Sequence, residues 1–272
     1  MHNTIKHDFP FKTLKVVPLI ILFLLTSLFL QAQPNCDTSI TRARVDKYYV
    51  GSYFKDYRDI ITCPFKPSVK KYTLAAVYGG AMYALISHYD EKIQIYSQDH
   101  KSGFATDASK YVFEPFGRGI YPISAIMLLY AEGVIWKNQK SKKVAMNATK
   151  SFIIATSFAQ IAKYAFTRQR PLVGPADAHK WEMGGGNASF FSGHTTTAFS
   201  IATVFAEEYK STVWVPIVAY TLAAGTGISR IYDNKHWASD VLTGALCGYL
   251  VGKLAVNKNN WGIKIVPRII IQ

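Results

Sequence analysis

The sequence has few cysteines, few acidic residues and no repeat of fixed period. Of its 272 residues, 3 are Cys and 17 are Asp or Glu. No two cysteines have the spacing of zinc ligands, so a zinc site is not expected. The missing repeat argues against a fibrous protein, and a hydrophobic content of 49% argues against a disordered one. The composition is therefore that of a chain that can bury a large core.

Basic residues dominate the charge of the chain. Lys and Arg number 31, which gives a formal net charge of +14 and a pI near 9.6. A basic protein attracts nucleic acid, an anionic membrane surface or a phosphorylated substrate. The sequence contains no basic run with interleaved aromatic residues, so nucleic acid is not an expected partner. Composition alone does not choose between an anionic membrane surface and a phosphorylated small molecule or lipid phosphate, and the oligomeric state is left open.

The first 33 residues have the pattern of a secretory signal peptide. Three lysines precede an uncharged apolar run over residues 16–30, and a small polar segment with Ala32 follows. At 15 residues the run is short for a membrane span, which needs about 20. The pattern predicts cleavage of residues 1–33 and export to the periplasm, with retention as a membrane anchor as the alternative. The lysines are Lys6, Lys12 and Lys15.

Two of the cysteines lie in the polar leader, residues 34–71, which follows the signal peptide. Cys36 and Cys63 could form a disulfide in an oxidising compartment or remain two thiols, and the sequence leaves both readings open. Cys247 lies inside an apolar run and is expected to be a small buried residue. Residues 34–71 are expected to be irregular or partly helical.

Apolar stretches of helical length recur after the leader. They are rich in Ala, Leu, Ile and Met and lack the strict alternation of half-buried strands. The pattern predicts an all-α fold, a single bundle of about six core helices in a domain over residues 72–256, followed by a tail over residues 257–272. The predicted helices are Tyr72–Tyr89, Ile120–Trp136, Val144–Phe166, His194–Tyr209, Thr212–Ile228 and Ala238–Val256.

The location of this bundle relative to the membrane has two interpretations. Three of the apolar stretches carry no charge over about a membrane thickness. The mean hydropathy of +0.07 is nevertheless low for a chain with several spans, and buried helices of large bundles are also apolar all round. We favour a periplasmic bundle that touches the membrane, with an integral membrane protein as the alternative.

The first of three chemically suggestive clusters is Lys163 to Pro171. Lys163 and Arg170 are seven residues apart, so on a helix they share one side, about 10 Å apart along the axis. Pro171 is expected to end the helix at Arg170. Two cations on one face suit a phosphate dianion, although a solvated helix end is the common alternative. Arg168 faces another side of an ideal helix and is predicted to be a bystander.

The second cluster is a glycine-rich loop that leads into an apolar helix. Ser192 can cap that helix, whose free backbone N–H groups form an anion site. Gly193 lets the backbone approach a ligand oxygen, and His194 can donate a proton there. Without further observations, a capped helix with a satisfied histidine explains the same residues.

The third cluster joins Arg230, His236 and Asp240. The histidine and the aspartate are four residues apart, which on a helix places the carboxylate beside the imidazole. Such a carboxylate fixes the tautomer of the ring and leaves its other nitrogen able to attack. Arg230 would add a guanidinium fork for phosphate. A surface pair on a helix is the ordinary alternative.

Together the three clusters are far more specific than any one of them. Their arrangement resembles the type 2 phosphatidic acid phosphatase superfamily, which includes bacterial nonspecific acid phosphatases and vanadium haloperoxidases. The middle motif departs from the family pattern, because Phe191 stands where the family has proline. The three motifs read Lys163-x6-Arg170-Pro171, Ser192-Gly193-His194 and Ser229-Arg230-x5-His236-x3-Asp240.

The resemblance implies hydrolysis of phosphomonoesters, including lipid phosphates, without a metal or other cofactor. His236 would attack phosphorus to form a phosphohistidine, Asp240 would hold its tautomer, and His194 would protonate the leaving oxygen. The implied substrate-binding residues are Lys163, Arg170, Ser192, Gly193 and Arg230. A vanadium-dependent haloperoxidase and a non-catalytic anion- or lipid-binding envelope protein are the alternatives.

Overall fold

Long helices build almost all of the chain that the structure describes. The structure is a computed structural model, and it describes residues 43–62, 68–182 and 188–257. The predicted signal peptide, Cys36, Cys63 and most of the predicted tail lie outside the described residues. The elements are α3 (Lys47–Thr62), α4 (Val69–His88), α5 (Asp90–Asp99), α6 (Gly103–Ala108), a π-helical turn (Ser109–Phe113), α7 (Glu114–Gly117), α8 (Ile120–Ile135), α9 (Gln139–Ala165), β1 (Thr167–Arg168), β2 (Trp181–Glu182), α10 (Gly193–Glu208), α11 (Trp214–Tyr232) and α12 (Ala238–Asn257).

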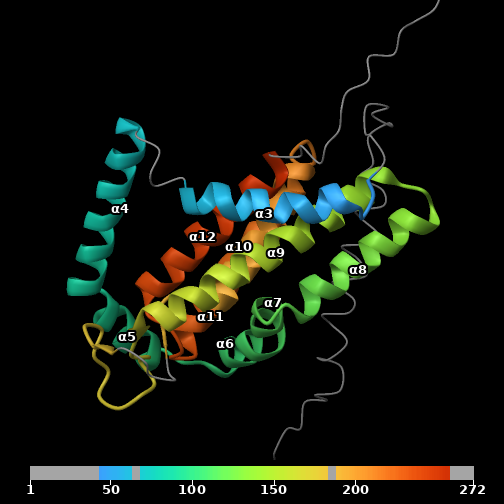
Figure 1. Cartoon of the computed structure of the whole chain (residues 1–272). Coiled ribbons are helices and arrows are strands. Elements are labelled where there is room, and N and C mark those ends of the chain that lie inside the picture. The colour runs from blue at the N-terminus through green and yellow to red at the C-terminus, as the bar shows by residue number, and fades with distance from the viewer. Residues whose placement is uncertain (1–42, 63–67, 183–187, 258–272) are drawn as a thin grey trace, which may run out of the picture.

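The core of the bundle forms around α10, which packs against α9, α11 and α12 (Figure 1). Its main apolar cluster includes Ile126 of α8, Val144 of α9, Val204 of α10 and Val215 of α11. The sequence prediction of an all-α bundle is confirmed. The second motif lies at the beginning of α10. The first motif lies at the end of α9, and the third lies between the end of α11 and the beginning of α12. The packing of these helices on α10 therefore brings the three motifs to one end of the bundle.

Glycines let α12 approach α10 closely. A Cβ added at Gly248 would lie 2.5 Å from the Thr196 carbonyl oxygen, and one added at Gly244 would lie 2.7 Å from the Ser192 carbonyl oxygen. These contacts are with backbone atoms, which cannot move aside without moving the helix. The pairing of α10 with α12 is therefore fixed by the absence of side chains at these positions.

The long helix α9 begins five residues before the predicted helix Val144–Phe166 and ends within one residue of it. It begins at Gln139, because the Asn138 side chain accepts hydrogen bonds from two backbone N–H groups of the first turn. It ends at Ala165, and the chain then enters β1, which pairs antiparallel with β2. Arg170 is therefore not on the helix that carries Lys163, and the prediction that the helix extends to Arg170 is wrong. The predicted helix Thr212–Ile228 is present as α11, which continues to Tyr232.

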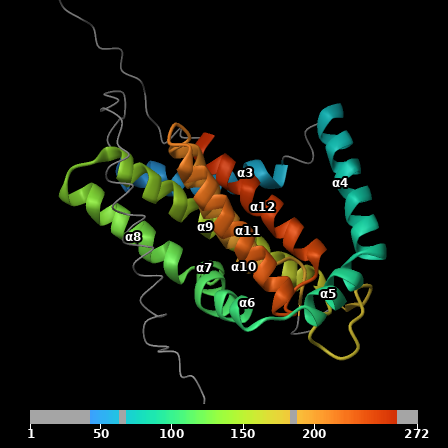
Figure 2. The same cartoon turned by 180° about the vertical axis from the view of Figure 1, so that it is seen from behind.

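The predicted helix Tyr72–Tyr89 is present as α4, but it lies outside the core. None of its residues is buried, and Figures 1 and 2 show it standing away from the bundle. The Tyr78 hydroxyl, 2.7 Å from the Thr243 hydroxyl, links it to α12. Among the described residues, only the segment Ala238–Val256 of α12 is long and apolar enough to cross a membrane, and 44% of it is buried in the protein.

Candidate active site

His236 lies in the turn between α11 and α12, with Asp240 in the first turn of α12. The imidazole is buried, and its Nδ1 is 2.8 Å from the backbone carbonyl oxygen of Ser189. The Asp240 carboxylate is farther away, with Oδ2 3.9 Å from Nδ1. Because the carbonyl can only accept, Nδ1 carries the proton and Nε2 holds the lone pair. The nearest group that sets the tautomer is thus Ser189. The Asp240 carboxylate lies beside the imidazole as expected, but His236 precedes α12, so the two residues do not share a helix.

Asp240 supports His236 through its charge and through Ser189. The Ser189 hydroxyl donates a hydrogen bond of 2.5 Å to Oδ2, and the Trp237 backbone N–H donates one of 3.0 Å to the same oxygen. The carboxylate therefore holds the loop residue whose carbonyl orients the imidazole. Its charge also favours protonated His236, against the burial that lowers the pKa of this ring.

Arg168 is buried and binds two carboxylates at the site, so the prediction that it is a bystander is wrong. The side chain is fully buried and forms ion pairs of 2.8 Å with Asp240 and with Asp90 of α5. The indole rings of Trp181 and Trp237 lie within 5.4 Å of its guanidinium carbon. The prediction assumed an ideal helix through Arg168, whereas α9 ends at Ala165 and β1 turns this side chain inward.

Three predicted cations surround the histidines. A Cβ added at Gly193 would lie 3.5 Å from the Lys163 Nζ atom, so the ammonium group lies at the beginning of α10. The Arg170 Nε–H donates to the Ala188 carbonyl at 3.4 Å, and Arg230 Nη2 is 2.8 Å from the Asp233 carboxylate. Burial lowers the pKa of each of the three, and Arg170 lowers that of Lys163 further.

The first turn of α10 has the predicted cap. Ser192 Oγ accepts hydrogen bonds from the Thr195 N–H at 3.4 Å and from the Thr195 hydroxyl at 2.9 Å. Its own hydroxyl hydrogen is left to donate. The Ser192 N–H donates to the Asp240 carbonyl, which ties this turn to α12. Phe191, in place of the family's proline, packs against Ala159 and Ala162 of α9 and so anchors the loop.

His194 has an unusual environment. Its Nε2 is buried and has no hydrogen-bond partner among the described residues. Burial lowers the pKa of His194 to about 3, with further lowering by Arg230, His236, Lys163 and Arg118. Those effects also show that these charged groups lie around the ring. His194 is neutral at pH 7 in the absence of an anion.

The predicted site residues therefore come together at one end of the bundle. Sequence reasoning missed the residues that hold the site in place. Arg168 and Ser189 bind the Asp240 carboxylate, Asp90 and Ser239 bind Arg168, and the Ser189 carbonyl orients His236. Asp90 gave no signal, because it lies far from the motifs in a short polar helix. No group of three or more His, Cys, Asp or Glu within the described ranges could hold a metal ion. The residues brought together are Lys163, Arg170, Ser192, Gly193, His194, Arg230, His236 and Asp240.

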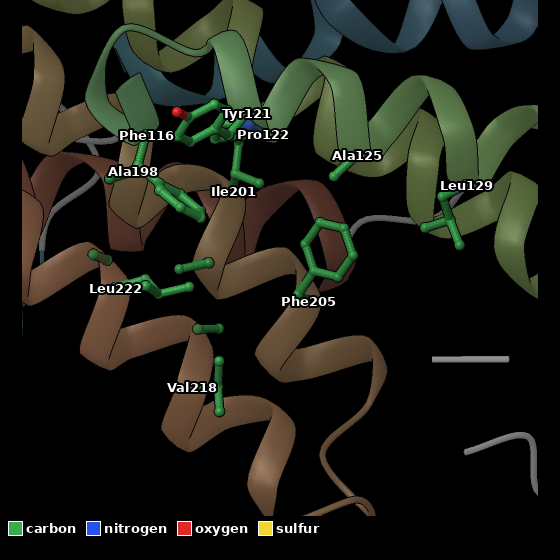
Figure 3. Close-up of a pocket in the computed structure, with 13 residues that line it drawn as sticks. Phe116, Tyr121, Pro122, Ala125, Leu129, Ala198, Ile201, Phe205, Val218 and Leu222 are labelled. Carbon is green, nitrogen blue, oxygen red and sulfur yellow. The ribbon is translucent and has the colours of Figure 1, made fainter. Parts of the chain in front are cut away.

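An apolar cavity of about 100 Å³ lies between α8, α10 and α11 (Figure 3). Ala198, one helical turn beyond His194, lines the end nearest the histidines, and Phe205 lines the far end. Phe116, which also lines it, precedes Gly117, and a Cβ added at Gly117 would clash with the His194 side chain. The cavity therefore begins beside His194 and extends along α10.

These features define a class of protein: an all-helical bundle in which buried cations and two imidazoles form a site for a phosphate-like anion. The sequence comparison makes the class more specific. Residues 145–263 match the model of the PAP2 superfamily, the family that the three motifs resemble.

Curated relatives match about half of the chain. Over 136 residues, it is 37% identical to a lipid A 1-phosphatase of Porphyromonas gingivalis, covering 50% of this chain and 28% of the relative. Over 141 residues, it is 25% identical to an undecaprenyl-diphosphatase of Sulfolobus acidocaldarius, covering 52% of this chain and 64% of the relative. The chain thus spans less than two thirds of the length of either.

A solved structure has a similar fold. It is the transmembrane PAP2 type phosphatidylglycerolphosphate phosphatase from Bacillus subtilis, with a TM-score of 0.51 and 20% sequence identity. The match covers 69% of this chain and 94% of that one. The similarity supports the helical architecture.

Proposed function

We propose that this protein is a phosphatase that hydrolyses lipid phosphates through a phosphohistidine at His236. The observation that carries the proposal is the position of His236: a buried imidazole with Nδ1 bound to the Ser189 carbonyl at 2.8 Å, beside Lys163 and Arg170. The remaining nitrogen, Nε2, has the lone pair that a nucleophile needs. The cations lie where charge would develop on the phosphoryl oxygens.

In the first step, His236 Nε2 forms a bond to phosphorus, and the bond from phosphorus to the leaving oxygen breaks. His194 donates a proton to that oxygen. Lys163, Arg170 and Arg230 hold the three equatorial oxygens, together with the N–H groups at the beginning of α10. Because these cations supply the charge stabilisation, the proposed reaction needs no metal ion.

The second step hydrolyses the phosphohistidine. His194, neutral after the first step, removes a proton from a water molecule that attacks phosphorus. The bond between phosphorus and His236 Nε2 breaks, and inorganic phosphate leaves. The role of His194 as an acid in the first step requires that a bound dianion offset the cations that lower its pKa.

The apolar cavity supports a lipid as the substrate. One of its lining residues, Ala198, lies one helical turn from His194, and its walls are almost wholly apolar. A hydrocarbon chain attached to the leaving oxygen would gain from burial there, while a small soluble ester would not. The names of the relatives, which include lipid A and undecaprenyl diphosphate, agree with this substrate class.

The test of the nucleophile is His236→Ala, assayed by phosphate release from phosphatidate in detergent. We expect the rate to fall by at least about 1,000-fold, because removal of a nucleophile costs that much or more in other hydrolases. His100→Ala, which removes an exposed imidazole stacked on Tyr96, is the matched control and should leave the rate unchanged. Substantial activity in His236→Ala would overturn the assignment.

Chelation by EDTA should leave the wild-type rate unchanged, and a loss restored by a divalent metal would contradict the metal-free scheme.

A further inference from the structure

The site carries another cation that the three motifs do not include. We propose that Arg118 binds a second phosphoryl group, joined to the reacting one through a bridging oxygen, so that the preferred substrate is a lipid diphosphate. This inference rests on the proposed function and adds a specificity-determining residue to it.

Arg118 and Arg230 share one carboxylate oxygen. Arg118 Nη2 is 2.7 Å from Oε1 of Glu114, and Arg230 Nη1 is 3.9 Å from the same oxygen. The two guanidinium groups therefore flank a single anionic oxygen. The Arg118 side chain is 59% exposed and that of Arg230 is 3% exposed, so Arg118 lies at the outer side of the site.

The backbone next to Arg118 lies directly against His194. A Cβ added at Gly117 would be 2.6 Å from the His194 Cβ and 2.7 Å from its Cδ2, so no side chain fits there. Arg118 follows Gly117 in the chain and lowers the pKa of His194, an effect smaller than those of burial, Arg230, His236 and Lys163. The second cation is thus beside the proposed proton donor, which is the side on which the leaving group departs.

This position suits one kind of leaving group. When a diphosphate reacts, His236 Nε2 bonds to the terminal phosphorus, the bond to the bridging oxygen breaks, and a lipid monophosphate departs with the electron pair. Water then releases inorganic phosphate from His236. The departing phosphate is anionic, and Arg118 can bind it with the donors that Glu114 does not use. An alcohol leaving group carries no such anion. Arg118 would therefore speed the hydrolysis of a lipid diphosphate and not that of a lipid monophosphate.

The test compares farnesyl diphosphate with farnesyl monophosphate, which share one hydrocarbon chain. We expect Arg118→Gln to lower kcat/KM for the diphosphate about 10- to 100-fold, the cost of one hydrogen-bonded charge contact. For the monophosphate kcat/KM should stay within about threefold. Arg118→Lys should recover part of the loss, because it restores the charge without the fork.

The matched control is Arg58→Gln, which removes an exposed arginine of α3 that is paired with Asp59. It should change neither substrate. Equal losses on both substrates in Arg118→Gln, or no loss on either, would overturn the role of Arg118. If the wild-type protein hydrolyses neither compound, the proposed function fails. The Arg118 assignment is then decided by calorimetry, in which Arg118→Gln must weaken binding of methylene diphosphonate and leave methylphosphonate unaffected.

Discussion

The two histidines of the site differ in what surrounds their ring nitrogens. His236 has a carbonyl partner that fixes its tautomer, while His194 has a buried Nε2 without a hydrogen-bond partner among the described residues. An unsatisfied buried nitrogen is costly, and such groups are concentrated at functional sites. Nε2 of His194 is therefore available to a substrate oxygen, as the proposed mechanism requires.

This difference predicts how His194 titrates. In the free protein its pKa is lowered to about 3, chiefly by burial and then by the surrounding cations. A bound oxyanion offsets those charges, so vanadate, which resembles five-coordinate phosphate, should raise the pKa towards its ordinary value of 6.5. The ring C–H signals of the histidines, followed by NMR over pH with and without vanadate, measure this shift.

The signal of His194 is assigned by its disappearance in His194→Gln. His100, an exposed histidine that hydrogen-bonds to the Tyr96 carbonyl, is the internal control and should titrate identically in both conditions. A His194 titration that vanadate leaves unchanged, while vanadate still inhibits phosphate release, would mean that His194 does not face the phosphoryl group.

At the residue scale, sequence reasoning finds the groups that would act on the substrate and misses those that hold them. Lys163, His194 and His236 belong to spaced motifs, and the structure places them together. The interpretation of Arg168 is wrong because it continues the helix past Phe166, whereas α9 ends at Ala165 and Arg168 lies in β1. Buried partners such as Asp90 leave no local pattern at all.

At the scale of the elements, apolar runs predict where helices occur better than where they stop. The predicted ranges for α8 and α12 agree with the structure within a residue, since each is mostly apolar between its ends. The helix α5 was not predicted, because its charged sequence reads as a connection. The packing of α10 on α12 was not predicted either, although the glycines of α12, four residues apart, were visible in the sequence.

The close contact of α10 and α12 predicts the effect of Gly248→Ala. The added Cβ would meet the Thr196 carbonyl oxygen at 2.5 Å and the Ser200 N atom at 2.9 Å, so the two helices must separate. We expect the free energy of unfolding to fall by about 1–3 kcal/mol, the usual cost of overpacking. The phosphatase rate should fall too, because α10 begins at His194 and α12 carries Asp240. Chemical denaturation followed by circular dichroism measures the first effect.

Gly80→Ala in α4 is the matched control for this substitution. An added Cβ there meets no atom within 4 Å, and alanine is the better helix former by about 1 kcal/mol. The control should therefore unfold at the same or a higher denaturant concentration and keep full activity. If Gly248→Ala behaved like Gly80→Ala, the close packing of α10 on α12 would not set the stability of the bundle.

At the scale of the whole molecule, exposed apolar side chains occur on several helices. Leu74, Val77 and Tyr83 of α4 are 60%, 64% and 72% exposed, and other exposed apolar side chains lie on α8 and α11. Such side chains on a chain with a net charge of +14 suit an anionic lipid bilayer, where the charges bring the protein to the surface and the apolar side chains hold it there. A substrate with a hydrocarbon chain would reach the cavity from the same phase.

We therefore predict that α4 enters the surface of a bilayer. When vesicles containing phosphatidylglycerol are added to the full chain in 1 M salt, which screens charges beyond about 3 Å, backbone amide exchange should slow over residues 69–88. It should stay unchanged over residues 47–62 of α3, which serve as the control within the same molecule. Leu74→Asp should weaken this protection at least about tenfold, because burial of one leucine contributes about 1.5–3 kcal/mol. Unchanged exchange over α4 with the vesicles bound would show that another surface makes the contact.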